Sequence, residues 1–144
     1  MAEAGDPWRL QRFVEAQAPV FEAVRAELAA GRKRTHWMWF VFPQLAGLGH
    51  SEMARRYAIA SADEARAYLA HPLLGPRLAE CAGLMLRTPT ANVRDVLGPP
   101  DDLKFRSSMT LFDAVAPNGA YGACLQRFFA GGRDEATVRL LAGG

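Results

Sequence analysis

Apolar residues recur at three- and four-residue spacing along most of the chain. This spacing places side chains on one face of an α-helix. The clearest examples are Val20, Val24 and Leu28, and Phe105, Met109, Phe112 and Ala116. Two-residue alternation, which is typical of a half-buried strand, is nearly absent. The pattern therefore predicts an all-α fold.

Helix-boundary residues divide the chain into short segments. Predicted N-terminal caps are Asp6 with Pro7, Ser51, Ser61 with Glu64, Thr90 and Asp134. Predicted stops are Gly31, Pro72, Pro89, Gly98 and the pair Gly131 and Gly132. Residues 101 to about 116 form the longest uninterrupted segment. We expect a single compact domain over residues 1–144, with about seven to eight short helices.

The segment from Trp37 to Phe42 is a continuous apolar run. Periodicity alone does not distinguish a short buried strand from a buried helix there, but the helical neighbours favour a helix. The run is far shorter than the ~20 residues that a membrane-spanning helix needs. We therefore expect no membrane partner.

Composition restricts the class of partner. Half of the 144 residues are apolar, 22% are charged and the formal net charge is only +2. Such a chain folds alone and offers no broad basic face, so we expect no nucleic acid partner. The one dense basic run, 32–34, is interpreted as a solvated loop, with a phosphate grip as the alternative.

The cysteines and the N-terminus bear on location. Cys81 and Cys124 have no neighbouring metal-ligand pattern, so we expect free, buried thiols and a reducing compartment. Residues 1–7 carry two acids and no apolar stretch, which predicts no secretion signal. The expected location is cytoplasmic, and the expected assembly is a monomer or weak homodimer.

The segment that begins at Asp101 carries polar residues among apolar ones. Projection at about 100° per residue places Lys104 and Ser108 inside the apolar arc. A buried lysine needs a partner, and Asp101, three residues earlier, is the nearest candidate. One interpretation is a capping aspartate paired with a lysine whose stem is buried. The other places Asp101 or Asp102, Lys104 and Ser108 at the rim of a polar pocket.

A second group of candidate residues lies between His36 and Gln44. Trp37 and Trp39 could offer flat faces to a base or sugar, although core packing is the favoured interpretation of these rings. Pro43 forces an extended backbone before Gln44, whose amide could enter a cleft. His71, before Pro72, is interpreted as a cationic helix cap. Common catalytic and metal motifs are absent, so we expect no cofactor and no metal.

Three blocks carry a family resemblance: HWMWFVFPQLAGLG at 36–49, AYLAHPLLGPRL at 67–78 and DDLKFRSSMTLF at 101–112. Together they resemble the bacterial and fungal family known as domain of unknown function 1810. The resemblance runs from Arg12 to the closing helix and implies a compact all-helical domain without supplying an activity. Some members carry the label calpastatin, which this compact composition contradicts.

A fainter similarity is to helical proteins that process NAD-derived or ADP-ribosylated molecules. The first functional hypothesis is accordingly a nucleotide or ADP-ribose-like ligand held between two groups of residues. These groups are His36, Trp37, Trp39 and Gln44, and Asp102, Lys104 and Ser108. If the site is catalytic, Asp101 or Asp102 would support hydrolysis of an N-glycosidic bond. The rival is a non-enzymatic domain that binds a peptide or protein through exposed tryptophans.

Overall fold

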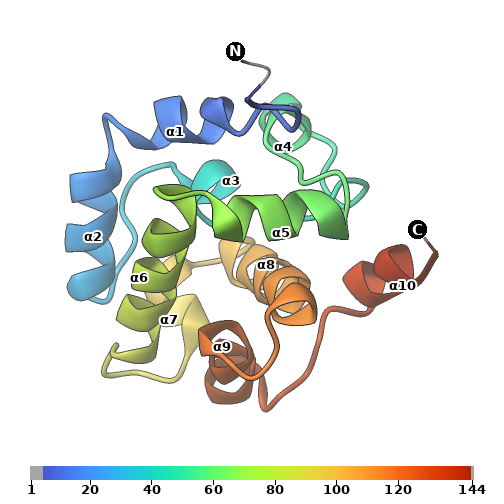
Figure 1. The fold of residues 1–144 in the computed structure, drawn as a ribbon. Helices are drawn as coiled ribbons and strands as arrows, with labels where there is room; N and C mark the ends of the chain where they lie inside the picture. The colour runs from blue at the N-terminus through green and yellow to red at the C-terminus, as the bar shows by residue number, and fades with distance from the viewer. Residues whose placement is uncertain (1–4, 144) are drawn as a thin grey trace.

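The computed structural model describes residues 5–143, which form ten helices and no strand (Figure 1). Their bounds are α1 Gln11–Gln17, α2 Phe21–Ala29, α3 Met38–Val41, α4 Glu52–Arg56, α5 Ala62–Ala70, α6 Leu74–Leu86, α7 Val93–Leu97, α8 Asp101–Val115, α9 Ala120–Phe129 and α10 Glu135–Gly143. Seven have seven or more residues, and α3, α4 and α7 are shorter. The all-α prediction is confirmed. The prediction that residues 1–7 carry no secretion signal lies partly outside the described residues, because residues 1–4 are not among them.

Helix α8 lies at the centre of the domain, with α5, α7, α9 and α10 packed around it (Figure 1). Its predicted stripe is fully buried, because Phe105, Met109 and Phe112 have no exposed surface. Burial extends to polar positions of the same helix, and Ser108 is as inaccessible as the aromatic rings. Only the N-terminal end of α8 therefore offers partly exposed polar groups beside the core.

Side-chain caps fix several helix starts. Ser51 Oγ accepts the N–H of Ala54 at 3.1 Å, and Ser61 Oγ accepts that of Glu64 at 3.2 Å, as predicted. Thr90 is not the cap of α7, because Asn92 Oδ1 accepts the N–H of Arg94 at 3.1 Å. The Thr90 hydroxyl instead accepts the N–H of Asn92, which holds the capping residue in place.

The first helix begins later than its signals predict. Asp6 accepts the N–H groups of Leu10 at 2.6 Å and Gln11 at 2.9 Å, and α1 starts at Gln11. The aspartate thus caps the helix from five residues away, across an intervening turn. The apolar run gives α3, as predicted, and Leu45 and Ile59 form a parallel bridge just beyond it.

His71 is the C-cap residue of α5, at the helix end where the sequence predicts a cap, but its ring takes a different role. Its Nδ1 accepts the N–H groups of Leu73 at 3.1 Å and Leu74 at 3.2 Å. The ring therefore accepts backbone N–H groups of the next helix, whereas the predicted role was that of a cation at the last carbonyls of α5. It supports the start of α6 rather than the end of α5.

The two cysteines are free and buried, as predicted. Burial raises the pKa of Cys81 and of Cys124 to about 12, so both thiols are protonated at neutral pH. Among residues 5–143, no helix has the length and hydropathy required to cross a bilayer.

Candidate functional site

The first turn of α8 carries two adjacent carboxylates, Asp101 and Asp102. Gly98, at φ 76°, ends α7, and its carbonyl accepts the N–H of Asp102 at 3.0 Å. Negative side chains are stabilised at this position by unpaired backbone N–H groups and the positive end of the helix dipole. The local sequence therefore places both carboxylates at the partly exposed end of a buried helix.

Asp101 lies between two lysines. Its Oδ2 is 3.0 Å from Lys33 Nζ, and its Oδ1 is 4.0 Å from Lys104 Nζ. The Lys33 side chain is only 8% exposed, and that of Asp101 is 18% exposed. The chain has 17 basic residues, of which these two are its only lysines. The structure thus brings the compact ammonium groups of the chain to one carboxylate.

Each lysine also faces a tryptophan ring. Lys33 Nζ lies 5.2 Å from the ring centroid of Trp37, and Lys104 Nζ lies 5.8 Å from that of Trp39. Cation–π attraction at these distances holds each ammonium in a preferred direction. Trp39 is half-buried, whereas Trp37 has no exposed surface. Of these two rings, only that of Trp39 presents an indole surface outside the core.

Asp102 is paired more loosely. Its Oδ2 lies 3.8 Å from Arg94 Nε, and the Arg94 side chain is 65% exposed. Its Oδ1 is buried and finds no hydrogen-bond partner within residues 5–143. A buried carboxylate oxygen without a hydrogen bond is costly, so Asp102 Oδ1 favours a bound group that can donate a hydrogen bond to it.

A hollow of about 540 Å³ adjoins this cluster, between the basic loop and α7. Its lining residues are Arg32, Lys33, Arg94, Asp95, Val96, Leu97 and Gly98. The Lys33 N–H donates to the Val96 carbonyl at 2.7 Å, which joins the two walls of the hollow. Three cations against one carboxylate make the hollow suited to an anionic group.

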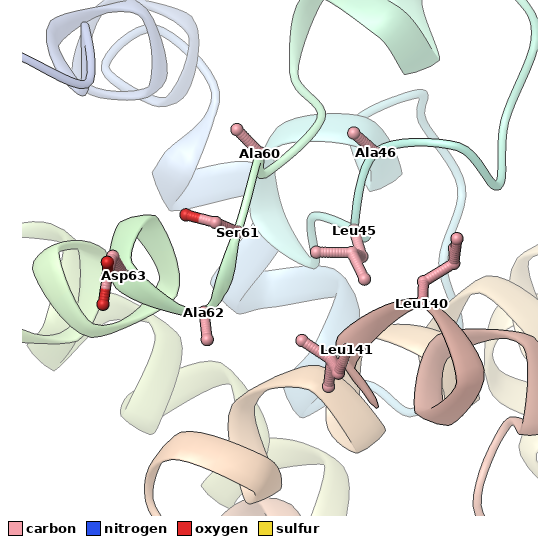
Figure 2. Close-up of a pocket in the computed structure, with 8 residues that line it drawn as sticks. All are labelled: Leu45, Ala46, Ala60, Ser61, Ala62, Asp63, Leu140 and Leu141. Atoms are coloured by element: carbon pink, nitrogen blue, oxygen red, sulfur yellow. The ribbon is translucent and has the colours of Figure 1, made fainter. Parts of the chain in front are cut away.

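A second cleft, of about 300 Å³, lies elsewhere, between α10 and the start of α5 (Figure 2). Leu140 and Leu141 of α10 face Leu45 and Ala62 across it. None of the charged cluster described above lines this cleft, and its side chains are mostly aliphatic. It therefore does not match the chemistry of the predicted polar pocket.

The predicted site residues are only partly brought together. Asp101, Lys104 and Trp39 form one contact chain, and Asp102 is adjacent in sequence. Ser108 shares their helix, but its buried Oγ finds no hydrogen-bond partner in the described part of the chain. These residues support a charged site at the start of α8.

The remaining predicted residues lie differently. His36 is exposed, away from the buried part of the charged cluster. The backbone carbonyl of Gln44 accepts the N–H of Ile59 at 2.9 Å, beside the parallel bridge. The indole N–H of Trp37 donates to Glu27 at 2.9 Å, inside the fold. The Trp37 ring can therefore contact the Lys33 ammonium. Because this ring has no exposed surface, it cannot stack on a ligand.

The sequence interpretation missed Arg94 and included Lys33 only through the alternative of a phosphate grip in the run 32–34. The run 32–34 was expected to be a solvated loop, yet the Lys33 side chain is nearly buried. Amino-acid composition offered one signal for Lys33. The chain has only two lysines among its 17 basic residues, and one of the two lies in this run. Within residues 5–143, no group of three or more His, Cys, Asp or Glu side chains could hold a metal ion.

The features described define a small all-helical domain with a charged site at the N-terminal end of its central helix. The family model described as "Protein of unknown function (DUF1810)" matches residues 7–141, and the chain belongs to this family. The resemblance stated from the three sequence blocks is thereby confirmed.

One solved structure is similar over nearly its whole length. It is the conserved hypothetical protein Rv1873 from Mycobacterium tuberculosis, with 56% sequence identity and a TM-score of 0.93. The match covers 95% of this chain and 99% of that one. Comparison with curated proteins gives no significant match.

Proposed function

We propose that the protein binds a phosphate-bearing, nucleotide-like small molecule beside the first turn of α8. The observation that carries this proposal is the convergence of Arg32, Lys33 and Arg94 on one hollow of about 540 Å³. This volume lies within the roughly 300–1,000 Å³ of small-molecule pockets. Arginine forks and a lysine point charge are the usual protein partners of phosphate.

The balance of charge at the site supports an anionic ligand. Four cations, Arg32, Lys33, Arg94 and Lys104, lie beside three carboxylates, Asp95, Asp101 and Asp102, which leaves an excess of one positive charge. Asp101 holds the largely buried Lys33 ammonium in position, so less conformational entropy of that side chain is lost when an anion binds. The positive end of the α8 dipole adds to the attraction.

Trp39 favours a nucleotide over a simple inorganic anion. Its half-buried indole lies beside Lys104, which Asp101 links to Lys33 and the hollow. A flat aromatic surface next to phosphate-binding cations suits a base or a sugar. We therefore place the phosphate at Lys33 and the base or ribose toward Trp39.

Hydrolysis of an N-glycosidic bond is the activity that the carboxylates would support. Asp101 is held by two lysines, whereas Asp102 Oδ1 has no donor within the described residues and can accept a proton. The bond from the sugar carbon to nitrogen would break with its electron pair on the nitrogen. Water would add to the carbon and pass a proton to Asp102 Oδ1. Because that oxygen is buried, this step requires the start of α8 to open locally.

A thermal-shift screen tests the binding proposal. Nucleotides, NAD, ADP-ribose and their fragments are added to the purified protein and to the Lys33→Met and Lys104→Ala variants. A ligand at 100 times its Kd stabilises by about 2.7 kcal/mol, which raises Tm by several degrees. Arg66→Met is the matched control, because Arg66 is exposed on α5 and paired with Asp63.

The expected result is a shift that the two lysine variants lose and the Arg66 variant keeps. No shift with any nucleotide would contradict the proposal and favour the peptide-binding alternative. The burial of Trp37 already weighs against that alternative, which relied on exposed tryptophans. Release of base from the bound nucleotide, measured by chromatography with Asp102→Asn as control, tests hydrolysis separately.

A further inference from the structure

The loop that carries Arg32 and Lys33 is fastened to α2 by one carboxylate, that of Glu27. Glu27 Oε1 accepts the N–H groups of Arg34 at 2.7 Å and Thr35 at 3.0 Å. The same oxygen accepts the indole N–H of Trp37 at 2.9 Å, and Oε2 accepts the Thr35 hydroxyl at 2.7 Å. Four donors from three residues of the loop thus converge on one side chain.

These contacts keep Glu27 ionised. Burial alone would raise the pKa of its carboxyl, but the hydrogen bonds from Thr35, Arg34 and Trp37 outweigh burial and lower the pKa to about 2. Hydrogen bonds to an ionised carboxylate are roughly twice as strong as those between neutral groups. The attachment of the loop is therefore strong at neutral pH.

Glu27 reaches Lys33 by two routes. Along the backbone, Lys33 precedes the clamped Arg34, and its own N–H donates to the Val96 carbonyl at 2.7 Å. Through side chains, Glu27 holds the indole of Trp37, and Lys33 Nζ lies 5.2 Å from the centroid of that ring. Both the path of the loop and the surface that supports the ammonium depend on the same carboxylate.

We infer that Glu27 is a positioning residue that sets Lys33 against Asp101 and thereby shapes the basic hollow. Glu27 does not line the hollow itself. The effect of Glu27 on ligand affinity rests on the proposed function, whereas its effect on the environment of Lys33 does not. The two can therefore be measured separately.

The test compares Glu27→Gln with Glu22→Gln. Both residues lie on α2, but the Glu22 side chain is 88% exposed and pairs with Arg25. Glutamine keeps the size of Glu27 and loses its charge and one acceptor oxygen. Each folded protein is acetylated with a small amount of reagent, so that only a minor fraction of its amines reacts. Mass spectrometry then gives the extent of acetylation of Lys33 relative to that of the N-terminal amine.

We expect Glu27→Gln to raise the relative reactivity of Lys33 severalfold and Glu22→Gln to leave it unchanged. If the thermal-shift screen has identified a ligand, its Kd should rise by roughly tenfold in Glu27→Gln. A loss of this size is typical when a residue that supports the binding groups is removed. If Glu27→Gln does not fold, Thr35→Val removes one of the four donors and should raise Lys33 reactivity by a smaller factor.

The outcomes separate the two ideas. Unchanged Lys33 reactivity in a folded but less stable Glu27→Gln protein would overturn the positioning role and leave the proposed function standing. Raised reactivity in that variant, with no nucleotide bound by the wild-type protein, would support the positioning role and contradict the proposed function.

Discussion

The pairing of Lys33 with Asp101 allows a quantitative test by double-mutant cycle. The two side chains are 8% and 18% exposed, and Nζ lies 3.0 Å from Oδ2. Truncating one partner of a fully buried pair costs about 3–5 kcal/mol, while exposed pairs contribute about 0.2–1 kcal/mol. Lys104 and the helix dipole still stabilise Asp101 after Lys33 is removed, so an intermediate coupling energy is expected.

The cycle uses Lys33→Met, Asp101→Asn and the double variant, with free energies of unfolding from urea denaturation. We expect a coupling energy of about 1.5 kcal/mol, between the buried and exposed limits. Each kcal/mol of destabilisation should lower Tm by about 4 °C for a domain of this size.

The control cycle uses Asp63 and Arg66 on α5, an ion pair with a similar separation of 2.7 Å but with side chains 77% and 59% exposed. Its coupling energy should be about 0.3 kcal/mol. If the Lys33–Asp101 coupling does not exceed that of the control pair, the description of Asp101 as the anchor of a partly buried cluster is refuted.

Four further predictions concern single residues in other parts of the fold. Gly122→Ala should destabilise by about 1–3 kcal/mol, because the new Cβ would lie 2.7 Å from Oδ1 of the buried Asp113. Gly83→Ala in α6 meets only Arg87 at 3.6 Å and should be neutral or stabilise by up to about 1 kcal/mol in chemical denaturation. Cys81 and Cys124, whose pKa values burial raises to about 12, should not react with a thiol reagent at pH 8 until denaturant is added; rapid labelling of the native protein would contradict their burial. The folded-state pKa of Glu27 is lowered to about 2 from an ordinary 4.5, so its contribution to stability is present above pH 4.5 and is lost as pH falls toward 2. Between pH 4.5 and 2, Glu27→Gln should therefore lose less stability than the wild type. If acid unfolding followed by circular dichroism gives parallel curves for the two proteins, the lowered pKa of Glu27 is refuted.

Local sequence signals predicted the central helix well. The run expected from Asp101 to about Ala116 is observed as Asp101–Val115, with its apolar stripe buried. Caps such as Ser51 and Ser61 were predictable for the same reason, since a hydroxyl and the N–H three residues later are close in sequence. Features set by neighbours along the chain were thus accessible from the sequence.

The candidate site depends on contacts that local patterns do not encode. Lys33 and Asp101 are far apart in sequence, and only the packing of the 32–37 loop beside α7 brings them to 3.0 Å. The same packing buries Trp37, which the sequence offered as either a core ring or a ligand contact. The role of the His71 ring likewise depends on the turn that follows it, where two N–H groups need an acceptor.

The most direct test of ligand binding at the start of α8 uses the two lysines as reporters. Protein labelled with ¹³C at lysine Cε gives two side-chain signals, from Lys33 and Lys104, and is titrated with ADP-ribose by NMR. Binding at the proposed site predicts that both signals shift along one saturation curve and that Asp101→Asn alters both starting positions. A thermal shift with ADP-ribose that leaves both lysine signals unmoved would place the ligand elsewhere and contradict the proposed function.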